Sequence, residues 1–194
     1  PANGRALCPL CEADLRAQHL HESLKDGTVS VWRHHGAPRQ LVLRLKHGSV
    51  SRAADILSQG MIEKAKAMQL PTDVVVTWVT MPKGRRRRRG IDHGYELARR
   101  VAEGLNAPCL PLLIRREGLR HTQEGLNRQK RISNLASAFG CVPMQGECVL
   151  LVDDVHTTGA TSLYCTMAML SAGAREVWTL TATAVPDKKR EEQA

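Results

Sequence analysis

The feature that most constrains this chain is an apolar run that ends in two adjacent carboxylates. Residues 148–152 have the length and composition of a buried β-strand, and Asp153 and Asp154 follow them directly. A turn rich in threonine and glycine comes next and leads into a segment with helical spacing. Because ligands of open α/β sheets bind beyond the carboxyl ends of the strands, this order of residues predicts a binding site.

The two parts of this stretch suit different parts of one ligand. Asp153 and Asp154 are suited to a sugar diol or a metal ion, because carboxylate oxygens accept hydroxyl hydrogen bonds and bind hard cations. The turn is suited to a phosphate, because backbone N–H groups at the start of a helix attract anions. We expect the phosphate to contact Thr157, Thr158, Gly159, Ala160 and Thr161.

Two other interpretations apply to the same stretch. One is a buried strand followed by a helix that an aspartate caps, and it stays open. The other is the phosphorylation site of a receiver domain, which also carries adjacent carboxylates after an apolar strand. There the pair ends the first strand of the domain, whereas only one helix and one strand can follow residues 148–162 here. The order of elements therefore excludes the receiver domain.

Strand-like and helical segments alternate through most of the chain. Helices are expected at residues 38–47, 50–68, 91–106, 126–138 and 163–170, and strands at 73–80, 109–114, 148–152 and 176–185. This alternation predicts an α/β fold, with a parallel sheet flanked by helices. We expect an N-terminal segment at 1–37, one α/β domain at 38–185 and a disordered charged tail at 186–194.

The balance of charge favours an anionic partner. The chain has 28 Lys and Arg against 19 Asp and Glu, a formal net charge of +9, which suits phosphorylated small molecules, nucleic acid or acidic proteins. Aromatic residues make up only 3%, which argues against binding single strands by base stacking. No apolar run approaches the roughly 20 residues that span a bilayer, and the N-terminus lacks a signal-peptide core. We therefore expect a cytoplasmic protein without membrane insertion.

A second informative stretch follows the strand expected at residues 73–80. Lys83 and Gly84 precede five consecutive arginines, Arg85 to Arg89. The backbone amides and guanidinium groups of such a loop suit a polyanion such as pyrophosphate. An arginine run is also typical of a solvated or nucleic-acid-binding patch, so both uses stay open.

Cys8 and Cys11 have the spacing of half a zinc site, because two thiolates three positions apart can share one metal ion. Tetrahedral closure needs two further ligands, and no second Cys-x-x-Cys follows. The nearest alternatives are His19 and His21, at a spacing unusual for such a site. A zinc site and an unmetallated turn both stay open. The other four cysteines, Cys109, Cys141, Cys148 and Cys165, are expected to be passive thiols.

Together these stretches resemble the ComF family of bacterial phosphoribosyltransferase-like proteins, with its ComFC and GntX-like members. The resemblance covers residues 40–185. It is most specific at Val152-Asp153-Asp154-Val155 and at residues 157–161, which match the phosphoribosyl pyrophosphate signature of type I phosphoribosyltransferases. It extends to residues 41–48 and 81–93 and to Gln123, Arg128, Asn134, Ala138 and Phe139.

The resemblance implies a type I phosphoribosyltransferase-like fold with a short remnant of an N-terminal zinc ribbon. It implies that the protein binds phosphoribosyl pyrophosphate with Mg²⁺, transfers the phosphoribosyl group to an unknown acceptor and serves natural competence. Asp153 and Asp154 would be the catalytic pair at the ribose hydroxyls, directly or through metal, and the turn at 157–161 would bind the 5-phosphate. The pyrophosphate and its surroundings would involve Lys83, Gly84, Arg85, Arg89, Gln123 and Arg128. A homodimer is a further expectation.

Three departures from the family pattern matter. Thr122 and Gln123 are adjacent where the family often has two residues between them, and the zinc ribbon is reduced to one cysteine pair. Thr157 stands where purine-salvage members carry an aspartate, which disfavours hypoxanthine or guanine as the acceptor. The rival hypothesis is a non-catalytic adaptor that contacts DNA or the DNA-uptake machinery, such as an ATP-dependent translocase. A third hypothesis is a sensor that binds the same ligand without turnover.

Overall fold

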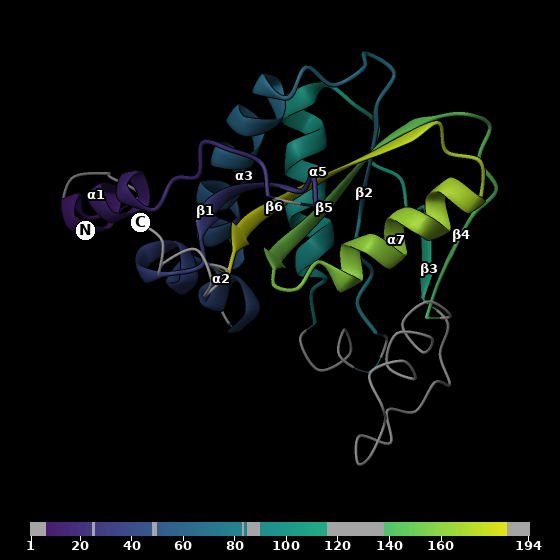
Figure 1. Cartoon of the computed structure of the whole chain (residues 1–194). Coiled ribbons are helices and arrows are strands. Elements are labelled where there is room, and N and C mark those ends of the chain that lie inside the picture. The colour runs from purple at the N-terminus through teal and green to yellow at the C-terminus, as the bar shows by residue number, and fades with distance from the viewer. Residues whose placement is uncertain are drawn as a thin grey trace.

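The centre of the molecule is a four-stranded parallel sheet (Figure 1). The computed structural model describes residues 7–24, 26–47, 50–82, 84, 90–115 and 138–185. The strands lie in the order β1-β6-β5-β2, and each neighbouring pair is parallel. Their bounds are Val29–Arg33 for β1, Val75–Trp78 for β2, Cys148–His156 for β5 and Glu176–Ala184 for β6. The predicted parallel α/β architecture is confirmed.

Helices cover both faces of the sheet, and the side chains of β5 show why. Leu150 and Val152 belong to a core that includes residues of α2 (Gly36–His47), α3 (Val50–Ala67) and α5 (His93–Leu105). Val149 and Leu151 belong to a second core that includes α7 (Ala160–Ser171). All four side chains are fully buried. Because successive residues of a strand point to opposite faces, one apolar run fills both cores.

The strand expected at residues 109–114 is divided by proline. Cys109 makes one parallel bridge to Val76 of β2, and the chain then turns at Pro111, where the N–H of Leu112 donates to the carbonyl of Leu110 at 3.0 Å. Proline has no N–H to donate to a neighbouring strand, so the ladder stops there. The chain continues as β3 (Leu113–Arg115), which pairs antiparallel with β4 (Phe139–Cys141) in a separate two-stranded sheet.

The N-terminal segment contains a helix that the sequence did not predict, α1 (Pro9–Ala17). None of its residues is buried, so it lacks the apolar stripe by which a helix is recognised in a sequence. Asp14 joins it to the rest of the fold, because its Oδ2 accepts the N–H of Ala37 at the start of α2, at 2.5 Å. β1 also precedes residue 38, so the parallel sheet includes a strand from this segment.

Two further expectations lie outside the described residues: the helix at 126–138, of which only Ala138 is described, and the charged tail at 186–194. In α7, the apolar residues Leu163, Met167 and Leu170 are exposed, whereas Tyr164, Cys165 and Met169 are buried.

None of the helices in the described part of the chain is both long and apolar enough to cross a membrane.

Gly60 of α3 packs against the indole ring of Trp32 in β1. A Cβ at this position would lie 2.2 Å from Cη2 of that buried ring. Alanine normally stabilises the interior of a helix relative to glycine by about 1 kcal/mol. Here we expect Gly60→Ala to lower the free energy of unfolding by about 1–3 kcal/mol, because the ring must move to admit the methyl group.

Urea unfolding followed by circular dichroism measures this change. Gln59→Ala is the matched control, since Gln59 is on the exposed side of the same helix and its substitution is expected to stay within about 0.5 kcal/mol. An unfolding midpoint for Gly60→Ala at or above that of the wild type would contradict the packing argument.

Candidate functional site

β5 carries the acidic pair beyond the buried core. The strand continues to His156, so Asp153 and Asp154 lie within it rather than after it, and Asp153 is in register with Thr181 of β6. Alternation along the strand directs the two carboxylates to different faces. Asp154 lies on the face that α2 covers, and Asp153 lies on the α7 face. The two aspartates are therefore adjacent in sequence but have different surroundings.

Asp154 contacts a cation from another part of the chain. Its Oδ2 lies 2.8 Å from Nζ of Lys46, near the end of α2, and both side chains are partly buried. The carbonyl of Asp154 also accepts the hydroxyl of Thr183 at 3.2 Å. Lys46 was missed as a site residue, although it lies in the stretch at 41–48 that resembles the ComF family. That resemblance was the only sequence feature that could have indicated Lys46, because Lys46 and Asp154 are too far apart in sequence to form a local pattern.

The surroundings of Asp153 disfavour its ionised form. Burial first, and then the adjacent Asp154 carboxylate, raise the pKa of Asp153 to about 8. The N–H of Asp154, which donates to Oδ1 of Asp153 at 2.9 Å, and the charge of Lys46 oppose this rise. A bound cation would favour the ionised form of such a carboxyl group.

The turn after β5 exposes backbone N–H groups at the start of α7. Thr157 and Thr158 are exposed, and Gly159 has φ +73° at the N-cap position, where no side chain caps the helix. The first N–H groups of any helix have no partner within it. The hydroxyl of Ser162 donates to the carbonyl of Gly159 at 2.9 Å and so fixes the turn. This is the geometry that binds an anion at a helix start.

A second carboxylate from outside this stretch reaches the turn. Oδ2 of Asp26 lies 3.4 Å from Nε2 of His156, and a Cβ on Gly159 would lie 2.5 Å from that same oxygen. Oδ1 of Asp26 accepts the N–H of Thr28 at 3.0 Å. No local pattern marked Asp26 or His156 as site residues. The positive φ of Gly159, more than this contact, explains physically why position 159 has no side chain.

The segment that leads to the arginine run leaves the sheet at the same edge. β2 ends at Trp78, which is in register with Val152, and the N–H of Val79 donates to the carbonyl of Val152 at 3.1 Å. Of the residues predicted to face pyrophosphate, Gly84 is described, and space around it is open. Lys83, Arg85, Arg89, Gln123 and Arg128 lie outside the described residues.

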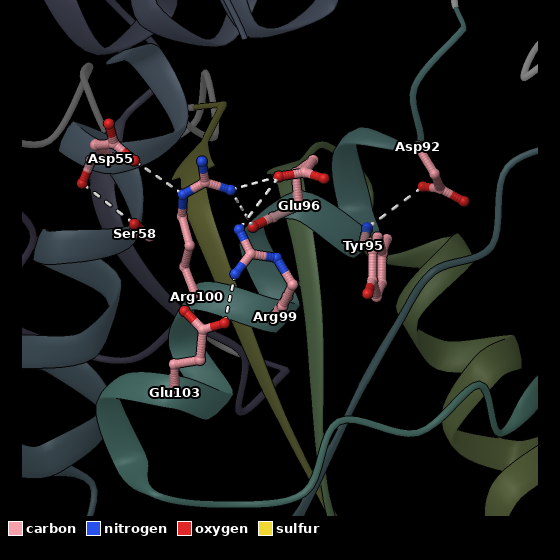
Figure 2. A network of polar contacts seen from close by, with 8 residues as sticks. All are labelled: Asp55, Ser58, Asp92, Tyr95, Glu96, Arg99, Arg100 and Glu103. Carbon is pink, nitrogen blue, oxygen red and sulfur yellow. Dashed lines mark hydrogen bonds and ion pairs between the residues drawn. The ribbon is translucent and has the colours of Figure 1, made fainter. Parts of the chain in front are cut away.

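The chain after the arginine run enters α5, which a polar network fixes to α3 (Figure 2). The Asp92 carboxylate caps the helix by accepting the N–H of Tyr95 at 3.4 Å, and it also accepts Nε1 of Trp78 at 3.4 Å. Arg100 joins the two helices, with Nε 2.9 Å from Asp55 of α3 and Nη1 2.5 Å from Glu96. The end of the arginine-rich loop is therefore anchored beside the end of β2.

The metal-ligating groups differ at the two predicted sites. Asp153 and Asp154 supply oxygen donors that fit Mg²⁺, which usually takes one or two carboxylates and completes its shell with water and substrate phosphates. For zinc, no group of three or more His, Cys, Asp or Glu side chains in ligating positions occurs in the described part of the chain. Cys8 and Cys11 are free thiols, and a zinc site at this pair stays a prediction.

Comparison with solved structures finds a phosphoribosylpyrophosphate amidotransferase and several phosphoribosyltransferases. The glutamine phosphoribosylpyrophosphate amidotransferase of B. subtilis is 21% identical over 67% of this chain and 26% of its own, with a TM-score of 0.45. An adenine phosphoribosyltransferase from Leishmania donovani is 16% identical over 89% of this chain and 78% of its own, with a TM-score of 0.46. The chain thus spans about a quarter of the amidotransferase.

Sequence comparison gives a more direct result, although no protein-family model matches the chain. DNA utilization protein YhgH of Escherichia coli O157:H7 is 27% identical over 92% of this chain and 85% of its own length. YhgH of Escherichia coli K12 is 30% identical over 74% and 66%, respectively. Competence protein F of Haemophilus influenzae is 28% identical over 88% and 81%. With the acidic pair and threonine-glycine turn in place, this chain belongs to the ComF family.

Proposed function

We propose that this protein binds phosphoribosyl pyrophosphate with Mg²⁺ at the carboxyl edge of its parallel sheet and transfers the phosphoribosyl group to an acceptor. One observation carries the proposal: the acidic pair of β5 and the glycine turn at the start of α7 lie within one continuous segment, 153–161. A pentose phosphate has hydroxyl groups and a terminal phosphate, so carboxylates and backbone N–H groups suit its two ends.

Each part of the segment has a separate role in this proposal. Asp153 and Asp154 accept hydrogen bonds from the ribose hydroxyls or bind Mg²⁺, and the turn at 157–161 donates backbone N–H groups to the 5-phosphate. Loss of pyrophosphate leaves positive charge on the ribose ring, which the nearby carboxylates stabilise. Mg²⁺, when bound with the ligand, would neutralise charge on the departing pyrophosphate. Lys83, Gly84 and one or more of the arginines at 85–89 are assigned to the same leaving group.

Lys46 is expected to contribute a cation to this site. It is within hydrogen-bonding distance of Asp154, and its removal leaves two adjacent carboxylates beside a polyanionic ligand. We expect Lys46→Met to weaken binding of phosphoribosyl pyrophosphate by about tenfold, because charge-assisted contacts contribute roughly 1.5–3 kcal/mol. Lys66→Met makes the same charge change at an exposed position of α3 and is the matched control. Isothermal titration calorimetry of both variants tests this prediction. Equal affinities of Lys46→Met and Lys66→Met for phosphoribosyl pyrophosphate would show that Lys46 is not part of the site.

The whole proposal is tested on the wild-type chain by two measurements. Titration calorimetry with phosphoribosyl pyrophosphate, with and without Mg²⁺, measures binding, and release of pyrophosphate in the presence of candidate acceptors measures turnover. Saturable Mg²⁺-dependent heat together with pyrophosphate release supports the transferase. Saturable heat without release favours the sensor hypothesis. Absence of heat at millimolar ligand contradicts both.

A second candidate function is an adaptor or DNA-binding component of the DNA-uptake machinery. The names of the relatives, competence protein and DNA utilization protein, favour it, and so does the formal charge of +9 with five consecutive arginines. The adaptor would keep the fold without requiring turnover. It differs from the transferase in needing no phosphoribosyl pyrophosphate for its contacts with DNA or with a translocase.

A further inference from the structure

Asp26 lies against the turn to which the proposed function assigns the 5-phosphate. A Cβ added to Gly159 would lie 2.5 Å from Oδ2 of Asp26, so this carboxylate oxygen is next to the backbone of the turn. The same oxygen lies 3.4 Å from Nε2 of His156, the last residue of β5. A carboxylate from the segment before β1 is therefore present where β5 leads into α7.

The loop that carries Asp26 is fixed by its own hydrogen bonds. The N–H of Leu24 donates to the carbonyl of Thr28 at 2.8 Å, and the N–H of Gly27 donates to the carbonyl of Leu24 at 3.0 Å. Oδ1 of Asp26 accepts the N–H of Thr28 at 3.0 Å, so Oδ2 is the oxygen that faces the turn. β1 begins directly after this loop, at Val29. Backbone contacts thus set the position of the carboxylate.

The charges around the turn favour one anion there and disfavour two. In the described part of the chain, Asp26 forms an ion pair with His156 and with no Lys or Arg. The residues of the turn, 157–161, have no charged side chain. The first N–H groups of α7 carry partial positive charge, and no side chain caps them. The Asp26 carboxylate and a bound phosphate would therefore both be attracted to the same end of α7.

We propose that Asp26 sets the affinity of the phosphate turn, because its carboxylate competes with the 5-phosphate for the start of α7 and repels it. The inference rests on the proposed function, since it concerns the phosphate of that ligand. Two anions a few ångströms apart near a protein surface repel each other, because the effective dielectric constant there is well below that of water. The carboxylate must move away from the turn, or stay beside the phosphate, and either lowers the affinity.

The loop before β1 is also held from a second side. Nζ of Lys64, in α3, donates to the carbonyls of Leu20 and His21 at 2.7 and 3.1 Å, shortly before the loop begins. A segment anchored on α3 and β1 thus carries the competing charge to a site that β5 and α7 build. Displacement of this loop would raise the affinity of the turn without any change in the turn itself.

The test is titration calorimetry of the full chain with phosphoribosyl pyrophosphate and Mg²⁺. Asp26→Asn keeps Oδ1 as the acceptor for the N–H of Thr28 and replaces the charged Oδ2 by a neutral amide. We expect this variant to bind the ligand about tenfold more tightly than the wild type at about 0.02 M salt. At about 0.5 M salt we expect the difference to fall to about twofold, because salt screens the repulsion. If Asp26 only held the turn in shape, its removal would weaken binding instead.

Two further variants separate this effect from net charge and from misfolding. Asp73→Asn makes the same charge change before β2, where Asp73 pairs with Arg175, and is expected to stay within about twofold of the wild type. Asp26→Ser also leaves an oxygen for the N–H of Thr28 and is expected to tighten binding. Circular dichroism checks that each variant is folded.

The outcomes distinguish this inference from the proposed function. If the wild type binds the ligand and the two Asp26 variants bind it equally or more weakly, the inference fails and the proposed function stands. A gain that does not depend on salt, or an equal gain in Asp73→Asn, would also overturn the inference. Binding by the Asp26 variants alone would support it. If neither the wild type nor these variants bind, the proposed function fails, and the inference fails with it.

Discussion

The double variant Asp153→Asn, Asp154→Asn is expected to bind phosphoribosyl pyrophosphate with Mg²⁺ on the order of a hundredfold more weakly than the wild type, or worse. Each carboxylate is assigned a charge-assisted contact to a ribose hydroxyl or to the metal, and such contacts contribute roughly 1.5–3 kcal/mol each. Asparagine has nearly the same shape, so circular dichroism is expected to be unchanged. Titration calorimetry with and without Mg²⁺ measures the loss.

The matched control is Asp73→Asn. Asp73 is a half-exposed carboxylate before β2, at the opposite edge of the sheet, where it pairs with Arg175 at 3.0 Å. Its removal changes the net charge but is expected to leave ligand affinity within about twofold, because a surface ion pair contributes little. If the wild type itself gives no heat at millimolar ligand, the transferase and sensor hypotheses both fail. The acidic pair would then be inherited architecture in an adaptor.

Replacing Arg85, Arg86 and Arg87 with serine is expected to weaken non-specific binding to DNA on the order of a hundredfold at about 0.1 M salt. Each arginine that contacts a phosphate releases about one counterion, so the slope of log affinity against log salt is expected to fall by about 3. Binding of phosphoribosyl pyrophosphate is expected to change less, because we expect at least some of these arginines to contact DNA rather than the small molecule. Fluorescence anisotropy with a labelled duplex, over a range of salt, measures the change.

The control for this variant removes three exposed cations elsewhere: Arg16→Ser, Arg39→Ser and Lys66→Ser. It makes the same change in net charge without altering the run after β2, so a similar loss of DNA affinity would show that overall charge, and not the run, binds DNA. Equal losses of DNA and of phosphoribosyl pyrophosphate binding in the Arg85–Arg87 variant would place the whole run in the small-molecule site.

The sequence by itself determined the elements that local patterns encode. The apolar run at 148–152 predicted β5, because a strand buried on both faces is apolar along its length. The helical spacing at 50–68 and 91–106 predicted α3 and α5, because each helix buries one apolar stripe. The acidic pair and the glycine turn were also visible, since one short segment carries both. Proline was the exception: the apolar run at 109–114 suggested one strand, but Pro111 divided it.

Only the tertiary structure decided how the site residues face one another. β5 continues through Asp153 and Asp154 because it pairs with β6 along this length. Successive residues of a strand point to opposite faces, so the two aspartates lie on different faces of the sheet. Lys46 reaches Asp154, and Asp26 reaches the turn at Gly159, because α2 and the segment before β1 arrive at the same edge of the sheet. Such contacts join residues far apart in sequence. These contacts depend on how the helices pack on the sheet, and no periodic pattern in the sequence predicts them.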